Sequence, residues 1–320
     1  MHIAVVVYDG VFDSGLSAIL DVLDNANALG GQIHESSPTW NVTLVGPAPQ
    51  VRTGAGFLVA PEPLEQADTA DLLVVPALAG SDPSVLLDHV GGETSLALRD
   101  LIARTRDRGA TIASACAGTF LLAEAGVLDG LRATTTWWLS PVFRDRYPKV
   151  ELDHSRMVIG CEGIITAGAA FGHVDLALAI VRAGSPALAD LVARYLVVDE
   201  RPSQAAYTIP SALAQSDPTV AAFERWTREH LAEPIRIPEA ASAIGVSERT
   251  LQRAVQRTVG TSPIRFVQDL RIERASHLLR TTDLSMETIS RKVGYEHPNT
   301  LRVLLRERTG KTTSALRGSR

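Results

Sequence analysis

The chain has 320 residues, of which 45% are hydrophobic, 21% are charged and 5% are aromatic, a composition typical of a soluble globular protein. No apolar run approaches the roughly 20 residues that span a bilayer, so no membrane-spanning helix is expected. The two cysteines, Cys116 and Cys161, exclude a disulfide framework, and no cluster of Cys and His has the spacing of a zinc site. We therefore expect a cytoplasmic protein without membrane partner, metal or cofactor. The apolar N-terminus is interpreted as a first strand and not as a signal peptide.

The net charge of −5 conceals an asymmetry along the chain. Residues 1–218 carry a net charge of −12, whereas residues 219–320 carry +7, almost all of it from arginine. An acidic body with a basic tail indicates a polyanionic partner for the tail alone.

Strand and helix signals alternate through the first 200 residues. Predicted strands cover Ile3–Val7, Val42–Val45, Asp71–Val75, Ala110–Ala115, Met157–Ile159 and Gly163–Thr166. Predicted helices cover Phe12–Leu29, Leu96–Arg108, Thr119–Ala125, Val174–Arg182 and Ala187–Val197. Such alternation predicts an α/β fold with a parallel sheet between two layers of helices. Ligands of such sheets bind at the carboxyl ends of the strands.

The alternation ends after residue 198. Residues 199–218 contain three prolines and several small polar residues, which predicts an exposed linker. Only helices are expected beyond it. We therefore divide the chain into a domain at 1–198, a linker at 199–218 and an all-α domain at 219–320.

The all-α domain contains an internal repeat of about 50 residues. In each copy a short helix, a glycine turn and a longer helix follow one another, with Gly245 matching Gly294 and Gly260 matching Gly310. This pattern predicts two helix-turn-helix motifs. The helix expected to begin at Ser262 is long enough to join them.

The faces of the second helix in each motif indicate which partner they meet. Over Glu248–Val259, apolar residues recur on one face and Arg249, Arg253 and Gln256 lie opposite, with Ser247 as a natural N-cap. Arginine can bind guanine and glutamine can bind adenine in the major groove. A solvated helix surface is the alternative for any single arginine, but the duplicated motif favours double-stranded DNA. The candidate DNA-binding residues are Ser247, Arg249, Thr250, Arg253 and Gln256 in the first motif, and His297, Asn299 and Arg302 in the second.

Residues 219–320 resemble the DNA-binding domain of the AraC-type transcription regulators. The resemblance rests on residues 247–253, 262–279 and 286–310. It implies two recognition helices that enter successive major grooves about 34 Å apart. Val303 departs from the polar residue that is frequent at its position in the family, so the second motif is expected to contact bases less. RNA polymerase is a candidate partner of a regulator of this kind.

The segment Ala110–Gly126 places a cysteine where a strand turns into a helix. The apolar run ends at Ser114. Cys116 and Gly118 follow, and then an alanine- and leucine-rich helix begins. Cys116 is therefore either a catalyst, a sensor or a small core residue at a tight turn.

Residues 1–198 resemble the DJ-1/PfpI group of the class I glutamine amidotransferase-like fold. The matching stretches are 8–23, 51–61, 72–77, 113–138 and 164–181. Together with the tail, they indicate a transcription regulator with an amidotransferase-like sensor domain. The resemblance implies a strained turn at Cys116, amides that lower the thiol pKa, and an acidic residue near the sulfur, for which Asp13 is the matching position.

The same stretches lack the groups that thiol hydrolysis requires. Many relatives carry a histidine where this chain has Thr136, and threonine is no base near neutral pH. His154 and His173 match no motif position, and Ala77 replaces a glycine that often supplies an oxyanion amide. We therefore expect no enzyme. A hydratase- or glyoxalase-like activity that needs only thiolate and carboxylate, or oxidation of Cys116 as a redox signal, stays open as the alternative.

The main hypothesis is a small-molecule site in a regulator that forms a homodimer. Its expected lining is Asp13, Cys116, Ala117, Thr136, Trp137 and Gly168. The anionic Asp13 favours a cationic or amine-bearing effector, such as an amino-acid-like compound. The competing interpretation is that the domain only dimerises and Cys116 is a tolerated small residue.

Overall fold

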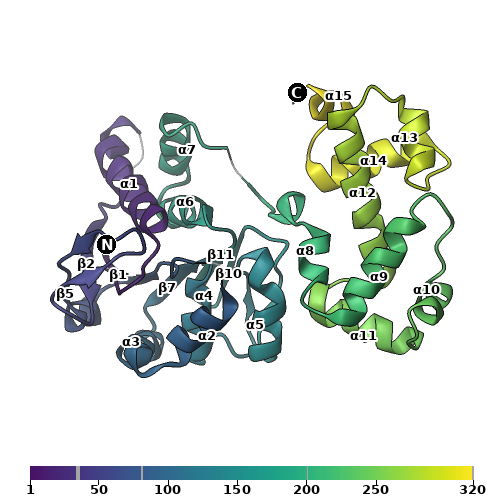
Figure 1. Cartoon of the computed structure of the whole chain (residues 1–320). Coiled ribbons are helices and arrows are strands. Elements are labelled where there is room, and N and C mark those ends of the chain that lie inside the picture. Colours follow the sequence, from purple (N-terminus) through teal and green to yellow (C-terminus); the bar gives the residue numbers. More distant parts are fainter. Residues whose placement is uncertain (34–36, 81, 200, 319–320) are drawn as a thin grey trace. The chain divides into compact units, whose positions relative to one another are not determined.

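The computed structural model describes residues 1–33, 37–80, 82–199 and 201–318, and it contains two compact units. Unit 1 comprises Met1–Gln204 and unit 2 comprises Ala205–Arg320 (Figure 1). Each unit is described on its own. Among the described residues, no helix combines the length and apolarity that crossing a membrane requires.

Unit 1 is built on a seven-stranded sheet in the order β10-β11-β7-β6-β1-β2-β5. Every neighbouring pair is parallel except β10 and β11, which are antiparallel. The strands are β1 (His2–Val6), β2 (Asn41–Gly46), β5 (Glu62–Pro63), β6 (Leu72–Val75), β7 (Thr111–Ala115), β10 (Val158–Cys161) and β11 (Ile164–Ala167). Two small sheets, β3 (Val51–Arg52) with β4 (Leu58–Val59) and β8 (Arg132–Ala133) with β9 (Glu151–Leu152), lie outside it. The predicted α/β sandwich is confirmed.

Helices cover both faces of the large sheet (Figure 1). One layer contains α1 (Asp13–Leu29), α6 (Gly172–Gly184) and α7 (Pro186–Tyr195), which pack on one another. The other contains α2 (Pro83–Gly91), α3 (Leu96–Asp107) and α4 (Gly118–Glu124), with α5 (Ser140–Arg146) beside them. The chain moves from β1 to β2 in one direction along the sheet and from β6 to β7 in the other, and with crossovers of one hand this reversal places helices on both faces.

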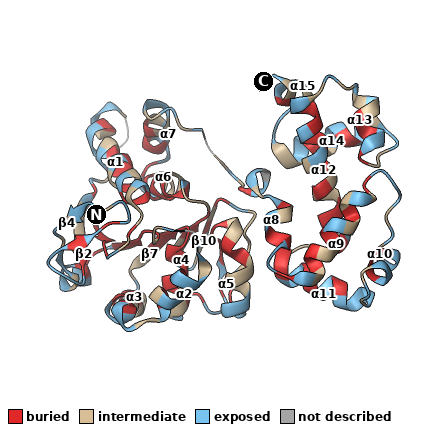
Figure 2. Ribbon diagram, viewed as in Figure 1, coloured by how far each residue is buried: buried red, intermediate tan, exposed pale blue. Residues whose placement is uncertain are grey.

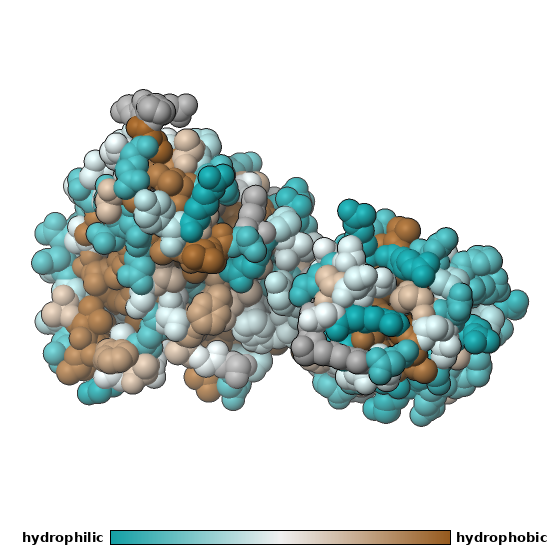
Figure 3. All heavy atoms as spheres, turned by 90° about the horizontal axis from the view of Figure 1, so that it is seen from above, coloured by the Kyte–Doolittle hydropathy of each residue, from teal (hydrophilic) through white to brown (hydrophobic). Residues whose placement is uncertain are grey.

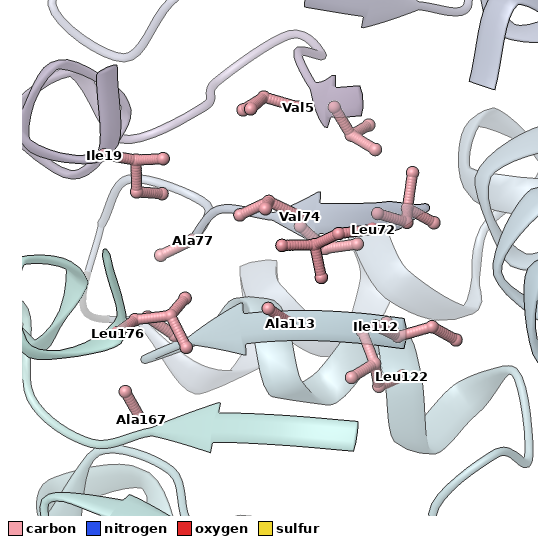
Figure 4. Packing of buried hydrophobic residues seen from close by; sticks show 14 of the residues in the cluster. Val5, Ile19, Leu72, Val74, Ala77, Ile112, Ala113, Leu122, Ala167 and Leu176 are labelled. Carbon is pink, nitrogen blue, oxygen red and sulfur yellow. The ribbon is translucent and has the colours of Figure 1, made fainter. Parts of the chain in front are cut away.

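The central strands β1, β6 and β7 are buried on both faces, which explains their nearly continuous apolar sequences (Figure 2). Figure 4 shows Val74 and Ala113 on neighbouring strands, with Ile19 of α1 and Leu176 of α6 nearby. All four side chains are less than 1% exposed. This core fixes the strand ends that carry the candidate site.

Unit 2 contains helices only, as predicted. They are α8 (Pro210–Ala214), α9 (Pro218–Glu229), α10 (Ile237–Ala243), α11 (Glu248–Val259), α12 (Pro263–Thr281), α13 (Met286–Lys292), α14 (Pro298–Thr309) and α15 (Thr313–Arg317). The two helix-turn-helix motifs are α10–α11 and α13–α14, and α12 runs between them (Figure 1). Gly245 and Gly294 both have φ of 75°, and Gly260 and Gly310 both adopt the left-handed conformation after the second helix. Glycine is favoured there because it has no Cβ.

The expected exposed linker at 199–218 differs from the structure. Gln204 is fully buried in unit 1, and Pro210 and Leu213 of α8 are buried in unit 2. The boundary between the compact units therefore lies at Gln204, not at residue 198. Proline and small polar residues predicted an open segment, but proline also starts helices such as α8. Residue 200, within the expected linker, lies outside the described residues.

Surface hydropathy differs between the faces of the units shown in Figure 3. Hydrophilic side chains dominate on unit 2, whereas more hydrophobic surface is visible on unit 1. Exposed apolar residues of unit 1 include Phe57, Phe171 and Val197.

Truncating Leu251 should destabilise unit 2, because its side chain is fully buried in the first helix-turn-helix motif. We expect Leu251→Ala to lower the free energy of unfolding by about 2–5 kcal/mol. Val303→Ala is the matched control, since Val303 is 56% exposed on α14, and should change it by less than about 0.5 kcal/mol. Urea denaturation followed by circular dichroism measures both. Equal effects of the two variants would contradict the burial pattern.

Candidate ligand site and nucleic-acid interface

Cys116 occupies a strained turn between β7 and α4. Its φ is 55°, in the left-handed region that residues with a Cβ rarely adopt. The turn is held by a hydrogen bond from the Cys116 amide to Ala167 O (2.8 Å) and one from Thr135 Oγ1 to Cys116 O (2.7 Å). A Cβ at Gly118 would lie 2.6 Å from Pro76 O, so only glycine fits where α4 begins. The turn therefore depends on contacts with three neighbouring segments.

The Cys116 thiol is a poor nucleophile in this turn. The residue is 6% exposed, and burial raises the pKa of its thiol to about 12. The backbone amide of Ala117 and the hydroxyl of Thr136 lower that pKa but do not overcome burial. Burial also raises the pKa of the neighbouring Tyr8, whose hydroxyl donates to Pro76 O (2.8 Å). The helix amides were expected to lower the thiol pKa. The Ala117 amide does so, but desolvation of the thiolate raises the pKa by more, so the net shift is upward.

The Asp13 carboxylate is bound to a loop of the small β3–β4 sheet. Its Oδ2 accepts a hydrogen bond from the Ala55 amide (2.7 Å), while Oδ1 is buried without a hydrogen-bond partner among the described residues. Asp13 is not among the groups that shift the pKa of Cys116. The structure therefore does not support the expected pairing of this carboxylate with the sulfur. The unpaired Oδ1 leaves Asp13 as a candidate ligand contact.

His173 is a structural residue whose ring binds the backbone amide of Ala77, the residue after Pro76. Its Nε2 accepts from the Ala77 amide (3.2 Å), and its Nδ1 donates to Ala170 O (2.6 Å). The side chain is fully buried, and burial lowers its pKa to about 4, so the ring is neutral. The amide that could have stabilised an oxyanion at this strand end is thus already engaged.

His154 is also engaged elsewhere. Arg144 donates to its Nδ1 (2.6 Å), and burial together with the Arg144 charge lowers its pKa to about 4. Within the described part of the chain, no histidine forms a hydrogen bond with Cys116. No histidine of the described segments is therefore placed to act as a general base toward this thiol.

Trp137 and Gly168 meet a residue that the sequence did not single out. The Trp137 amide donates to Gln204 Oε1 (3.2 Å), and a Cβ on Gly168 would lie 2.0 Å from Gln204 Nε2. Gln204 lay in the predicted linker, and no motif marked it. Of the six predicted lining residues, the structure therefore gathers Cys116, Ala117 and Thr136 at the turn and Trp137 and Gly168 around Gln204, whereas Asp13 contacts the β3–β4 loop.

The first recognition helix, α11, has two distinct faces. Leu251, Ala254 and Val255 are buried, while Arg249 and Arg253 are exposed and form no hydrogen bond or ion pair within the described residues. The Ser247 hydroxyl accepts from the Thr250 amide (3.1 Å), which caps the helix as expected. This burial confirms the predicted apolar back and polar front of the helix.

An open groove of about 720 Å³ runs beside α11. Its lining includes Thr250, Arg253 and Gln256, three of the five predicted DNA-binding residues of this motif, together with Arg257. Arg257 is paired with Asp217 (2.8 Å), so its charge is partly neutralised. Arg253 is the uncompensated cation of the groove within the described residues.

The second recognition helix, α14, differs from α11 in how its polar residues contact one another. Arg302 donates to Asn299 Oδ1 (2.6 Å), so two of the three predicted residues contact each other. His297 is exposed, but its side chain forms no capping hydrogen bond to the helix. Val303 is 56% exposed on the same helix. The structure places the three residues in the first turns of α14, and fewer base contacts by this motif stay a prediction.

Comparison with known proteins assigns both units. The model of the DJ-1/PfpI family matches residues 1–183, more than half of the chain. The chain belongs to the DJ-1/PfpI family. A helix-turn-helix domain model matches residues 240–319 of this DJ-1/PfpI protein, which confirms the AraC-type tail expected from the sequence.

Relatives of this DJ-1/PfpI protein share both units. It is 27% identical over 275 residues to the HTH-type transcriptional regulator CdhR of Pseudomonas aeruginosa, covering 85% of this chain and 79% of CdhR. It is 25% identical over 278 residues to GlxA of Rhizobium meliloti, covering 85% of this chain and 82% of GlxA. An AraC family transcriptional regulator from Pseudomonas putida matches with a TM-score of 0.51 and 18% identity, covering 61% of this chain and 98% of that structure. The last likeness confirms the fold of unit 1.

Cys116 should resist alkylation, because a thiol with a pKa of about 12 is ionised to only about one part in ten thousand near pH 8. We expect iodoacetamide to modify Cys161, which is partly exposed, well before Cys116. Mass spectrometry of tryptic peptides identifies the modified residue, and Cys116→Ser should give the same labelling as the wild type. Faster labelling of Cys116 than of Cys161 would show an activated thiol instead.

His173 should make unit 1 less stable in mild acid. Its pKa is lowered to about 4 in the folded state. Below about pH 6.5 the unfolded chain therefore binds a proton at this histidine that the native state does not bind. The stabilisation is complete above about pH 6.5 and is lost as the pH falls toward 4, at most about 3 kcal/mol. His173→Gln, which cannot be protonated, should reduce this pH dependence by about half, because His154, whose pKa is also lowered to about 4, still titrates over the same range. Tryptophan fluorescence during urea denaturation measures it, because three of the four tryptophans lie in unit 1. An unchanged slope would contradict the assignment.

Proposed function

We propose that this protein is a DNA-binding transcriptional regulator whose helix-turn-helix unit is controlled by a small molecule bound to the DJ-1/PfpI domain. The relatives that share both units are named as HTH-type transcriptional regulators. One observation carries the proposal: α11 exposes Arg249 and Arg253 opposite a fully buried apolar face, inside a motif that the chain repeats. A merely structural helix needs no such unpaired arginines.

The side chains of α11 suit direct contact with bases. Arg249 and Arg253 can bind guanine O6 and N7, and Gln256 can bind adenine N6 and N7. Ser247 and Thr250, at the start of the helix, are placed to meet phosphate oxygens. In this proposal α11 supplies most of the sequence specificity.

The second motif adds a further set of DNA contacts. The helix between the motifs, α12, has 19 residues and is therefore about 28 Å long, comparable with the roughly 34 Å between successive major grooves. His297, Asn299 and Arg302 would meet the second groove. Because Arg302 is held by Asn299, we assign this motif mainly to phosphate contact.

The effector site is proposed at the carboxyl ends of β7 and β11, with Asp13 as a further contact. Asp13 Oδ1 is a buried oxygen without a hydrogen-bond partner among the described residues, and the buried Thr136 hydroxyl lies against the Cys116 thiol. Such groups favour a bound molecule that supplies donors, such as an amine. Cys116 and Ala117 would shape the site sterically, and Trp137 and Gly168 lie beside it.

Enzymatic turnover is not part of this proposal. Thiol catalysis requires a thiolate and, for acyl transfer, a base and an oxyanion amide. Burial raises the pKa of Cys116, and the Ala77 amide donates to His173. These observations also disfavour a hydratase- or glyoxalase-like reaction and a redox role of Cys116, since both need an accessible thiolate.

The proposed partners follow from the charge and the surface of each unit. The basic tail meets double-stranded DNA in the cytoplasm, with RNA polymerase as a candidate partner of the bound regulator. The exposed apolar residues of unit 1, including Phe171 and Val197, favour a homodimer. Effector binding would act by its difference in affinity between the states of the protein.

Removing Arg249 or Arg253 should weaken specific DNA binding. We expect each Ala variant to lose about 1–3 kcal/mol, or about 5- to 150-fold in Kd, and to relax base choice at one position. Gel shifts with a duplex selected by the wild type from random sequence measure the affinity. Lys149→Ala is the control, because it removes a positive charge from unit 1, where the side chain is 76% exposed. Unchanged affinity in both arginine variants would show that α11 is not the recognition helix.

A further inference from the structure

Residues 201–204, which lead directly into unit 2, are fastened to unit 1 along their whole length. Arg201 pairs with Asp175, and the Met157 amide donates to Pro202 O (3.3 Å). Ser203 Oγ and the Gln204 amide both donate to Ser155 O, at 2.7 Å and 2.9 Å. We call residues 201–204 the connector. Its position is thus set by unit 1, and the next residue, Ala205, begins unit 2.

The Gln204 side chain of the connector is fully buried in a pocket of unit 1. Its Nε2 donates to Thr135 O (2.7 Å) and lies 3.3 Å from both Thr134 Oγ1 and Arg156 O. Its Oε1 accepts from the Trp137 amide (3.2 Å). The pocket therefore offers oxygen acceptors to the amide nitrogen and an N–H donor to the amide oxygen.

This arrangement is selective for a primary carboxamide. A carboxylate would place a negative oxygen against the carbonyl oxygens of Thr135 and Arg156, and an apolar group would leave these polar groups unpaired. The pocket also requires a glycine at position 168, since a Cβ there would lie 2.0 Å from Gln204 Nε2. Both polarity and shape thus fit one chemical group.

The carboxamide pocket lies next to the Cys116 turn. Thr135 supplies the carbonyl that binds Gln204 and the hydroxyl that binds Cys116 O. The Gly168 amide donates to Met157 O (2.7 Å), beside the connector. A molecule in the proposed effector site would therefore lie close to Gln204, because Thr135 contacts both the Gln204 side chain and the Cys116 turn.

We propose that this pocket is a primary-carboxamide site, which Gln204 occupies in the absence of effector and which a carboxamide-bearing effector takes by displacing Gln204. Displacement removes the hydrogen bonds of the Gln204 side chain and so loosens the connector, which is then held by Arg201, Ser203 and its backbone. This inference rests on the proposed function and adds the chemical class of the effector and its route of action.

The tether sets the conditions of the competition. Gln204 is covalently attached, so its effective concentration at the pocket is on the order of millimolar or higher. A simple amide competes poorly, and an effector needs additional contacts, which the neighbouring Cys116 turn would supply. A mutation that removes the Gln204 side chain removes this competitor, so the selectivity of the empty pocket can be measured with small molecules.

The first experiment empties the pocket and refills it. Gln204→Ala removes the atoms of acetamide from the side chain, and acetate is the matched control of nearly equal shape. Hydrogen exchange of the Gln204-site and Met157 amides in the full-length protein reports whether the connector is held. We expect exchange on the order of tenfold faster in the variant, given the several hydrogen bonds lost. Acetamide should restore protection and acetate should not.

The second experiment displaces the Gln204 side chain from the pocket while residue 204 itself is unchanged. Gly168→Ala should drive the side chain out, speed exchange in the connector and abolish any response to acetamide. Gly172→Ala is the matched control, because a Cβ there meets only ordinary contacts at 3.7 Å or more, and should leave exchange unchanged. In the wild type, a large excess of acetamide should speed exchange in the connector while the amides of β1 stay protected.

The outcomes separate this inference from the proposed function. Wild-type protection in Gln204→Ala, equal rescue by acetate, or no effect of Gly168→Ala would overturn the carboxamide site, whatever the protein does at DNA. Loss of specificity for DNA is measured independently with the Arg249 and Arg253 variants, so a failure there leaves the exchange results interpretable on their own.

Discussion

The parallel pairing of β6, β7 and β11 is the constraint on which the rest of unit 1 depends. Parallel strands end at the same edge of a sheet, so their register fixes which backbone groups meet there. Val75 pairs with Ser114, and Ala167 pairs with Ala115. This register presents Ala167 O to the Cys116 amide and Val75 O to the Ser114 hydroxyl. The strained cysteine turn follows from it.

The sequence alone predicted much of this architecture. The β-branched strands, the alternating helices and the repeated glycine turns were each tied to a local physical cause, such as the left-handed conformation at Gly245 and Gly294. The buried and exposed faces of α11 also followed from helical spacing. Such features are set within a few residues of the chain, which is why a pattern can reveal them.

The properties of the site depend on distant segments and were not predictable in the same way. The pKa of Cys116 depends on how completely other segments bury the thiol. His173 reaches the Ala77 amide across 96 positions of sequence, and Gln204 reaches Thr135 across 69. A motif can mark a turn, but burial and long-range hydrogen bonds decide its chemistry. For that reason the sequence suggested a reactive thiol where the structure has a neutral one.

A single carboxylate in unit 2 affects two helices at once. Asp217 Oδ1 accepts the Thr219 and Val220 amides at the start of α9, and Oδ2 accepts from Arg257 near the end of α11. This pairing partly neutralises Arg257, the last cation of α11, so unpaired positive charge is concentrated in the earlier turns, at Arg249 and Arg253. In the proposed DNA complex, this uneven distribution would bring the amino-terminal turns of α11 closest to the phosphate backbones.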